Sequence, residues 1–300
     1  MLKKSGIILS IIMLLFTVSC KKENKNNSTL SVDLTNQISL SEFEYADKYS
    51  KELLKNFTGN VRVNNEDGTF LELPYKNGLI EGTGKEYSED GKLISTTEYK
   101  LGIMDGLSQT FYTSGKVKNE INMKEGLKDG TFKSYYENGK LENSLKYVLG
   151  KAEGKDLWYY RTGELELEIP YISNKKEGVS LEYYKNGKVK IKREYSLDLI
   201  ENIVYEYYES GAIKAEITFL HNFPNGKSTW YYENGKVEQI SLFEKGVKVG
   251  ETSVYNPDGS LFSKITYENG KIISGKCSNG YIWKESDIEK WNNKIKIDCK

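Results

Sequence analysis

A 24-residue period in glycine, aromatic and aliphatic positions runs through most of the chain. A glycine recurs at this spacing without a slip at Gly91, Gly115, Gly139, Gly163, Gly187, Gly211, Gly235 and Gly259. An aromatic residue stands four positions before each of these repeat glycines, and an aliphatic residue stands two positions after it, as Tyr135 and Leu141 do around Gly139. Self-similarity at such a period is the signature of a repeat architecture, in which each unit packs against its neighbours.

The residues after each repeat glycine predict a β-strand. Apolar residues two, six and eight positions on share parity, as in Leu141, Leu145 and Tyr147. Alternate residues of a strand face the same side, so one side of this strand is expected to be buried. A second strand is expected before the next glycine, which makes each unit one hairpin. At roughly 4.7 Å between strands, eight or nine hairpins predict an elongated single-layer, all-β array on the order of 80 Å long.

Two rows of turn residues separate the predicted strands. The first row contains Asn-Gly at 138–139, 186–187 and 234–235, a dipeptide typical of hairpin turns in which both central residues have positive φ. The second row holds Gly, Asn or Asp every 24 residues, at Gly78, Gly102, Gly126, Gly150, Asn174, Asp198, Asn222, Gly246 and Gly270. These residues tolerate left-handed backbone, so we expect a backbone requirement at each position.

The segments that precede the array predict a tether and a cap. Residues 20–40 are expected to form a flexible tether, because the segment begins with many Lys, Asn and Ser residues. Ser41 and Glu44 resemble a capping box and predict an N-terminal helical cap over 41–57. The hairpin array is then expected over residues 60–275.

A second cap is expected over residues 276–300. Ser286 and Glu289 repeat the capping-box pattern, which predicts a short C-terminal helix. Cys277 and Cys299 are an isolated pair in this segment, and outside the cytoplasm such a pair favours a disulfide. The cap is therefore expected to be held by that bond.

The first twenty residues resemble a bacterial lipoprotein signal. Lys3 and Lys4 precede an apolar run that is too short for a transmembrane helix, and the run ends in Thr17-Val18-Ser19-Cys20. This ending resembles a lipobox with Thr where Leu is usual. The resemblance implies removal of residues 1–19, acylation of Cys20, and a membrane anchor in the cell envelope, periplasmic or surface-exposed. The alternative is an ordinary signal peptide followed by a chance cysteine.

Charge and residue usage exclude several function classes. The 43 basic and 43 acidic residues balance and are spread along the chain, so no electrostatic footprint for nucleic acid is present. The chain has one histidine, His221, and no CxxC motif, which argues against a metal site. Its recurring carboxylates occupy turn positions rather than acid–base pairs. We therefore expect no enzyme activity, no cofactor and no metal.

The repeat units resemble MORN repeats. The run Tyr75-Lys-Asn-Gly78-Leu-Ile-Glu-Gly82 is similar to the core of a MORN repeat, and units of the type Tyr135-Tyr136-Glu-Asn-Gly139-Lys-Leu141 resemble the variant repeats of the YwqK-like antitoxin family. The resemblance covers about 215 residues by its repeat boundaries. It implies a hairpin array that serves as a binding or scaffolding surface. A lipid-anchored chain departs from the intracellular antitoxin role.

Adjacent aromatic pairs before the repeat glycines supply the candidate binding residues. Neighbours in a strand point to opposite faces, so the first member is expected to face the core and the second to face outward. The outward row and two nearby tryptophans form a predicted stripe of Tyr112, Tyr136, Tyr160, Tyr184, Tyr208, Tyr232, Trp158 and Trp230. Tyrosine combines rigid contact area with a hydrogen-bonding tip. The alternative is a packed aromatic ladder without a ligand.

Two functions remain open at this point. The first is an anchored interaction module that binds a protein partner, such as a toxin entering the envelope, which would make the chain an immunity-type lipoprotein. The second is a structural lipoprotein of the envelope or surface that binds glycan, peptidoglycan or membrane lipid through the tyrosine stripe.

Overall fold

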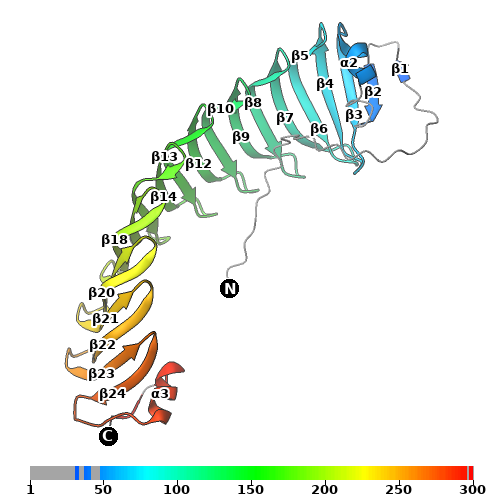
Figure 1. Cartoon of the computed structure of the whole chain (residues 1–300). Coiled ribbons are helices and arrows are strands. Elements are labelled where there is room, and N and C mark those ends of the chain that lie inside the picture. The colour runs from blue at the N-terminus through cyan, green and yellow to red at the C-terminus, as the bar shows by residue number, and fades with distance from the viewer. Residues whose placement is uncertain (1–30, 34–36, 42–47, 296, 300) are drawn as a thin grey trace.

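The chain forms one long sheet with a short helix near each end. The computed structural model describes residues 31–33, 37–41, 48–295 and 297–299. Within these residues the sheet has 24 strand segments, and consecutive strands lie side by side in a stack of hairpins that curves into an arc (Figure 1). The predicted all-β array of antiparallel hairpins is confirmed. The predicted signal peptide and Cys20 lie outside the described residues.

The strands are β1 (Ser31–Asp33), β2 (Gln37–Ser41), β3 (Gly59–Asn64), β4 (Phe70–Lys76), β5 (Leu79–Ile80), β6 (Gly82–Tyr87), β7 (Leu93–Lys100), β8 (Ile103–Phe111), β9 (Val117–Lys124), β10 (Leu127–Lys128), β11 (Gly130–Tyr135), β12 (Leu141–Val148), β13 (Lys151–Tyr159), β14 (Leu165–Ile172), β15 (Lys175–Lys176), β16 (Gly178–Tyr183), β17 (Val189–Ser196), β18 (Leu199–Tyr207), β19 (Ile213–Leu220), β20 (Phe223–Tyr231), β21 (Val237–Glu244), β22 (Val247–Tyr255), β23 (Leu261–Glu268) and β24 (Lys271–Cys277). The helices are α2 (Lys48–Leu54) and α3 (Glu285–Asn292).

Strands also occupy part of the predicted tether and N-terminal cap. β2 pairs in parallel with β3, through Ile38 and Val61 among others, so the tether predicted over 20–40 is wrong for the residues in β1 and β2. Apolar and polar residues alternate through Ile38 and Leu40, which is a strand pattern. Ser41 ends β2 and α2 begins at Lys48, so the capping box predicted at Ser41 is wrong.

A β-bulge in each hairpin decides which side chains share a face. In the β16–β17 hairpin Glu182 pairs with Ile191 and Tyr183 pairs with Val189, so Lys190 is an extra residue. The same register shift precedes the first aromatic of the pair in the hairpins from β6–β7 to β22–β23. A bulge residue keeps its side chain near that of its neighbour. Lys190 Nζ accordingly lies 2.7 Å from Glu182 Oε1.

We call the side of the sheet that carries Glu182 face A and the opposite side face B. Small residues are buried on face A, where the Ser241 and Thr252 hydroxyls lie 2.9 Å apart. On face B the Tyr135 hydroxyl donates to Glu120 Oε1 at 2.6 Å. The first aromatic of each pair was expected to face the buried side, and this prediction is wrong. The bulge moves it to face B with the aliphatic residue that it pairs with, because directly paired residues share a face.

The two turn rows differ from the prediction in backbone conformation. At 138–139 only Gly139 has positive φ, at 86°, and its N–H donates to the Tyr136 carbonyl at 2.8 Å. The prediction of positive φ at both residues of Asn-Gly is therefore wrong for this row. The second row has that conformation instead, as in Leu149 (φ 45°) and Gly150 (φ 80°). A longer turn followed by a bulge needs left-handed backbone only at its glycine.

The C-terminal cap closes the last strand of the array. Cys277 and Cys299 form a disulfide with their Cα atoms 5.8 Å apart, and Trp283 packs over Gly275 in a small core that includes Ile297. This core covers part of β24 and so limits the exposed sheet edge.

The start of α3 differs from the predicted capping box at Ser286 and Glu289. The N-cap residue is Lys284, and its backbone N–H donates to Asp287 Oδ2 at 2.9 Å. Asp287 lies three residues after Lys284, which is the box spacing shifted by two residues. The hydrogen bonds from Lys284 and from Tyr281 hold the pKa of Asp287 below its usual value.

Candidate binding surface

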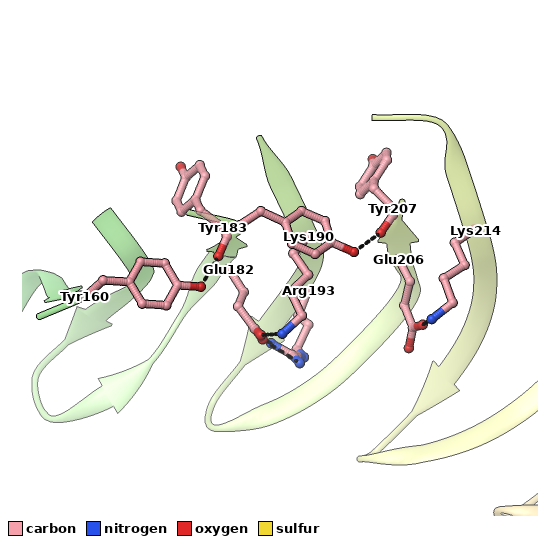
Figure 2. A network of polar contacts seen from close by, with 9 residues as sticks. Tyr160, Glu182, Tyr183, Lys190, Arg193, Glu206, Tyr207 and Lys214 are labelled. Carbon is pink, nitrogen blue, oxygen red and sulfur yellow. Dashed lines mark hydrogen bonds and ion pairs between the residues drawn. The ribbon is translucent and has the colours of Figure 1, made fainter. Parts of the chain in front are cut away.

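The second tyrosine of each aromatic pair connects one hairpin to the next. Each hydroxyl donates to the backbone carbonyl of the residue 23 positions later, which is the first aromatic of the following hairpin. These bonds are 2.6–2.7 Å long and join Tyr112 to Tyr135, Tyr136 to Tyr159, Tyr160 to Tyr183, Tyr184 to Tyr207, Tyr208 to Tyr231, and Tyr232 to Tyr255. Figure 2 shows two of them. The row therefore forms a tyrosine ladder that holds the stack together.

The ladder has the geometry that the packing alternative predicts. Partial burial raises the pKa of the Tyr136 and Tyr160 hydroxyls, and each donor is already used within the chain. The rings remain half-buried, with Lys190 Nζ 6.0 Å from the Tyr184 ring centroid. A role of these rings in binding a ligand stays a prediction.

Charged residues interrupt face A in the middle of the array. The buried rows of this face carry mainly Ser, Thr, Ala, aliphatic and aromatic residues, and Asp156, Glu182, Arg193 and Glu206 are exceptions in three consecutive hairpins. The positions equivalent to Arg193 in the neighbouring hairpins hold isoleucine. We call these four residues the central charged patch.

Asp156 is the most buried member of the central charged patch. Its side chain is on β13 and is 7% exposed. Asn143 Nδ2 donates to one carboxylate oxygen at 2.5 Å, and Trp158 Nε1 donates to the other at 2.9 Å. Burial raises the pKa of Asp156 because it disfavours the ionised form, and the two hydrogen bonds oppose that shift. A carboxylate buried at this position costs folding free energy, so we expect Asp156 to have a role other than stabilising the fold.

The other members of the patch form ion pairs on face A. Glu182 contacts Lys190 at 2.7 Å and Arg193 at 3.3 Å, and Glu206 lies 3.7 Å from Lys214. Figure 2 shows these groups on one side of the sheet, with the rings of Tyr183 and Tyr207 directed to the other. Glu182 and Arg193 are 23% and 24% exposed, so they are partly desolvated and still reachable.

Both predicted tryptophans lie on face A, but in different surroundings. Trp158 belongs to the patch through its bond to Asp156. Trp230 is two hairpins further along the array than the Glu182 pair and packs on Phe243 with ring centroids 6.1 Å apart. Trp158 is thus part of the charged patch, whereas Trp230 contacts an aromatic neighbour.

The charged patch was not among the residues predicted from sequence. Its signal is present there: each member occupies a position that is uncharged in most other hairpins, such as Ser180 and Ser228 at the position of Asp156. The sequence prediction selected residue types that recur in every hairpin, whereas these four residues are the places where the repeat is broken.

Metal and membrane-spanning features are absent from the part of the chain that the structure describes. No three His, Cys, Asp or Glu side chains in it come together as a metal site. Neither described helix is long and apolar enough to span a membrane.

Comparison with known proteins identifies the repeats. A family described as "MORN repeat variant" matches residues 80–101, 104–125, 128–148, 176–196, 200–221, 224–245 and 248–273, which together exceed half of the chain. The matches leave out residues 149–175. This unmatched hairpin holds Asp156 and Trp158.

Other comparisons add little. No curated protein matches the sequence. The crystal structure of TcdB2-TccC3-Cdc42 aligns with 71% of this chain at 12% identity, and the alignment spans 15% of that chain with a TM-score of 0.17. A similarity at this TM-score supports no conclusion on fold or function.

Proposed function

Since the chain belongs to the MORN repeat variant family, we propose that it is a non-catalytic, lipid-anchored scaffold that binds a protein partner through the central charged patch on face A. The patch gathers Asp156, Glu182, Arg193 and Glu206 beside Trp158. Tryptophan and arginine are among the residue types most enriched at the energetic centres of protein interfaces, and here Arg193 and Trp158 lie on the same face. This grouping is the observation that carries the proposal.

Stability does not explain the patch. A buried ion pair is often no better for folding than apolar residues of similar volume, and the raised pKa of Asp156 indicates that its two hydrogen bonds do not fully offset the cost of burying its charge. The hairpins on either side carry uncharged residues at these positions, Phe132 and Ser180 for Asp156 and Ile169 and Ile217 for Arg193. The charged residues therefore cost folding free energy that another role has to justify.

The partner is proposed to lie in the bacterial cell envelope. The resemblance of residues 1–20 to a lipoprotein signal supports an anchor at Cys20. The resemblance to YwqK-like antitoxins suggests a toxin entering the envelope as the first partner class to test. In that case the chain is an immunity-type lipoprotein.

The test uses variants that give the patch the residues of other hairpins. Asp156→Ser, and Glu182→Ser combined with Arg193→Ile, are expected to abolish capture of the partner from envelope extracts while the thermal midpoint stays level or rises. Glu86→Thr removes the equivalent charge from face A of the β6–β7 hairpin, away from the patch, and is the matched control. Capture that survives both patch changes excludes the central patch as the site.

The alternative function, binding of glycan, peptidoglycan or membrane lipid, is less favoured. The ladder hydroxyls that would bond to sugar groups donate to backbone carbonyls instead, as Tyr160 does to Tyr183. Retention of the chain on cell-wall or lipid preparations, lost on Tyr136→Ala and Tyr184→Ala, together with the absence of any captured protein, would select this alternative.

A further inference from the structure

Lysines interrupt a row of apolar residues on face A, beside the second row of turns. The row consists of the residue two positions after the Gly, Asn or Asp of each turn: Ile80, Met104, Lys128, Ala152, Lys176, Ile200, Pro224, Lys248 and Ile272. Tyr195 pairs with Gly178, which lies four residues before Glu182 in the same strand, so Tyr195 and the equivalent residues of other hairpins are on face A. Each lysine pairs directly with one of these equivalent residues, as Lys176 does with Tyr171, and therefore shares that face.

Each of the three lysines places its ammonium group over an aromatic ring. The distances from Nζ to the ring centroid are 4.9 Å for Lys128 and Tyr147, 5.2 Å for Lys176 and Tyr195, and 4.9 Å for Lys248 and Tyr267. None of these lysines forms an ion pair within the described part of the chain. Burial lowers the pKa of Lys128 and of Lys248, because it disfavours the ammonium form. A ring attracts a cation but carries no net charge, so these half-buried ammonium groups lack a counter-charge.

Two of the lysines lie on either side of Asp156. Asp156 is on β13, between Tyr147 on β12 and Tyr171 on β14, and its charge adds to the effect of burial in raising the pKa of both tyrosines. Lys128 lies over Tyr147, and Lys176 pairs with Tyr171. Each lysine is two strands from Asp156, or about 9 Å at 4.7 Å per strand.

We propose that the partner of face A presents carboxylates to Lys128 and Lys176, on either side of Asp156. The inference rests on the proposed function, in which a protein binds around the central charged patch. Two ammonium groups without an ion pair complement acidic side chains, and such complementarity gives an interface its specificity. The partner is therefore an acidic protein segment with carboxylates about 19 Å apart, the distance across four strands.

Lys248 provides a matched control within the same row. It has the same ring contact as Lys128 and is also half-buried, but it lies eight strands from Asp156, or about 38 Å. An interface of standard size buries about 800 Å² on each partner, which corresponds to a radius of about 16 Å. A partner centred on Asp156 reaches Lys128 and Lys176 but not Lys248.

Zero-length carbodiimide cross-linking of the full chain in its cell envelope tests this proposal. The reagent joins a lysine amine to a carboxylate only where the two groups touch, and mass spectrometry identifies the linked residues. Lys128 and Lys176 are expected to be linked to Asp or Glu residues of the captured protein, whereas Lys248 is expected to stay unlinked. Links at all three lysines, or at neither Lys128 nor Lys176, overturn the proposal.

Variants of the lysines measure their contribution to binding. Lys128→Met and Lys176→Ile introduce the residues that neighbouring hairpins carry in this row, so the thermal midpoint is expected to stay level. Each variant is expected to weaken capture of the linked protein roughly tenfold, because a partly desolvated charge pair is lost. Lys248→Ile is expected to leave capture unchanged.

The outcomes separate this inference from the proposed function. If Asp156→Ser abolishes capture while Lys128→Met and Lys176→Ile do not weaken it, the acidic partner is refuted and the proposed function stands. If the chain captures no protein and instead binds vesicles of phosphatidylglycerol through its face A lysines, both are refuted, because the lysines then serve a lipid surface.

Discussion

The tyrosine ladder predicts different effects for two adjacent tyrosines. Tyr160→Phe removes a hydroxyl that donates to the Tyr183 carbonyl at 2.7 Å, whereas the hydroxyl of Tyr159 has no hydrogen bond within the described residues. A neutral hydrogen bond contributes about 1 kcal/mol net, and partial exposure lets water replace some of it. We therefore expect a loss of about 1 kcal/mol for Tyr160→Phe and almost none for Tyr159→Phe.

Hydrogen exchange is the suitable assay, because long repeat arrays need not unfold in one step. A loss of about 1 kcal/mol corresponds to roughly fivefold faster amide exchange across the β14–β16 junction, where the affected hairpins meet. Exchange in β22–β23 is expected to stay unchanged, since strands contact only their neighbours. Equal effects of Tyr159→Phe and Tyr160→Phe would refute the role of the ladder.

The whole ladder extends the same reasoning. Its six bonds are about 9.5 Å apart, so their contributions should add. Replacing all six tyrosines by Phe would then cost about 6 kcal/mol, which is comparable to the entire stability of many domains. An array that keeps its denaturation midpoint after this change would show that the rings, and not the hydroxyls, hold the hairpins together.

Three further predictions concern the patch and the C-terminal cap. Because burial raises the pKa of Asp156, its ionisation destabilises the fold at neutral pH, and this cost disappears as the pH falls through the raised pKa. In urea titrations, the free energy of unfolding of the unaltered chain should therefore rise relative to that of Asp156→Ser between pH 7 and pH 4. A difference that stays constant with pH would contradict this prediction. Gly275→Ala would place a methyl group 2.2 Å from a Trp283 ring carbon, so tryptophan fluorescence should report a cap destabilised by about 1–3 kcal/mol, with the exposed Ser274→Ala unchanged. Reduction of the Cys277–Cys299 bond should cost about 3 kcal/mol by the loop-entropy model, measured as a lower melting temperature of the cap but not of the array.

The hairpin array could be predicted because its determinants recur in every unit. Turn glycines, paired aromatics and alternating apolar residues each follow from the geometry of a β-sheet, and eight copies exclude coincidence. The prediction of which side chains share a face of the sheet was wrong because of one feature, the β-bulge in each hairpin. The bulge residue, such as Lys190 in β16–β17, shifts the parity of everything before it, and nothing in the composition of one hairpin shows that an extra residue is present.

The prediction for the N-terminal strands β1 and β2 was wrong for a different reason. The Lys-, Asn- and Ser-rich start of the segment 20–40 predicts a tether, but its last residues alternate through Ile38 and Leu40 as a strand does. A strand of five residues that pairs in parallel with β3 has no turn signal to announce it, because its partner is reached through α2. The prediction therefore rested on the Lys, Asn and Ser content of the segment and missed the short alternation of apolar and polar residues at its end.

The regular repeat makes the fold predictable but gives little information on where the functional site lies. Folding requires the repeat, so residues that satisfy it carry little information on function, and the second tyrosines illustrate this because their hydroxyls stack the hairpins. Function in such an array should lie where the repeat is broken at a cost in folding free energy. Asp156, buried on face A where the other hairpins carry an uncharged residue, is such a break. Since the buried charge of Asp156 does not stabilise the array, the surface around it is the place where a partner is expected to bind.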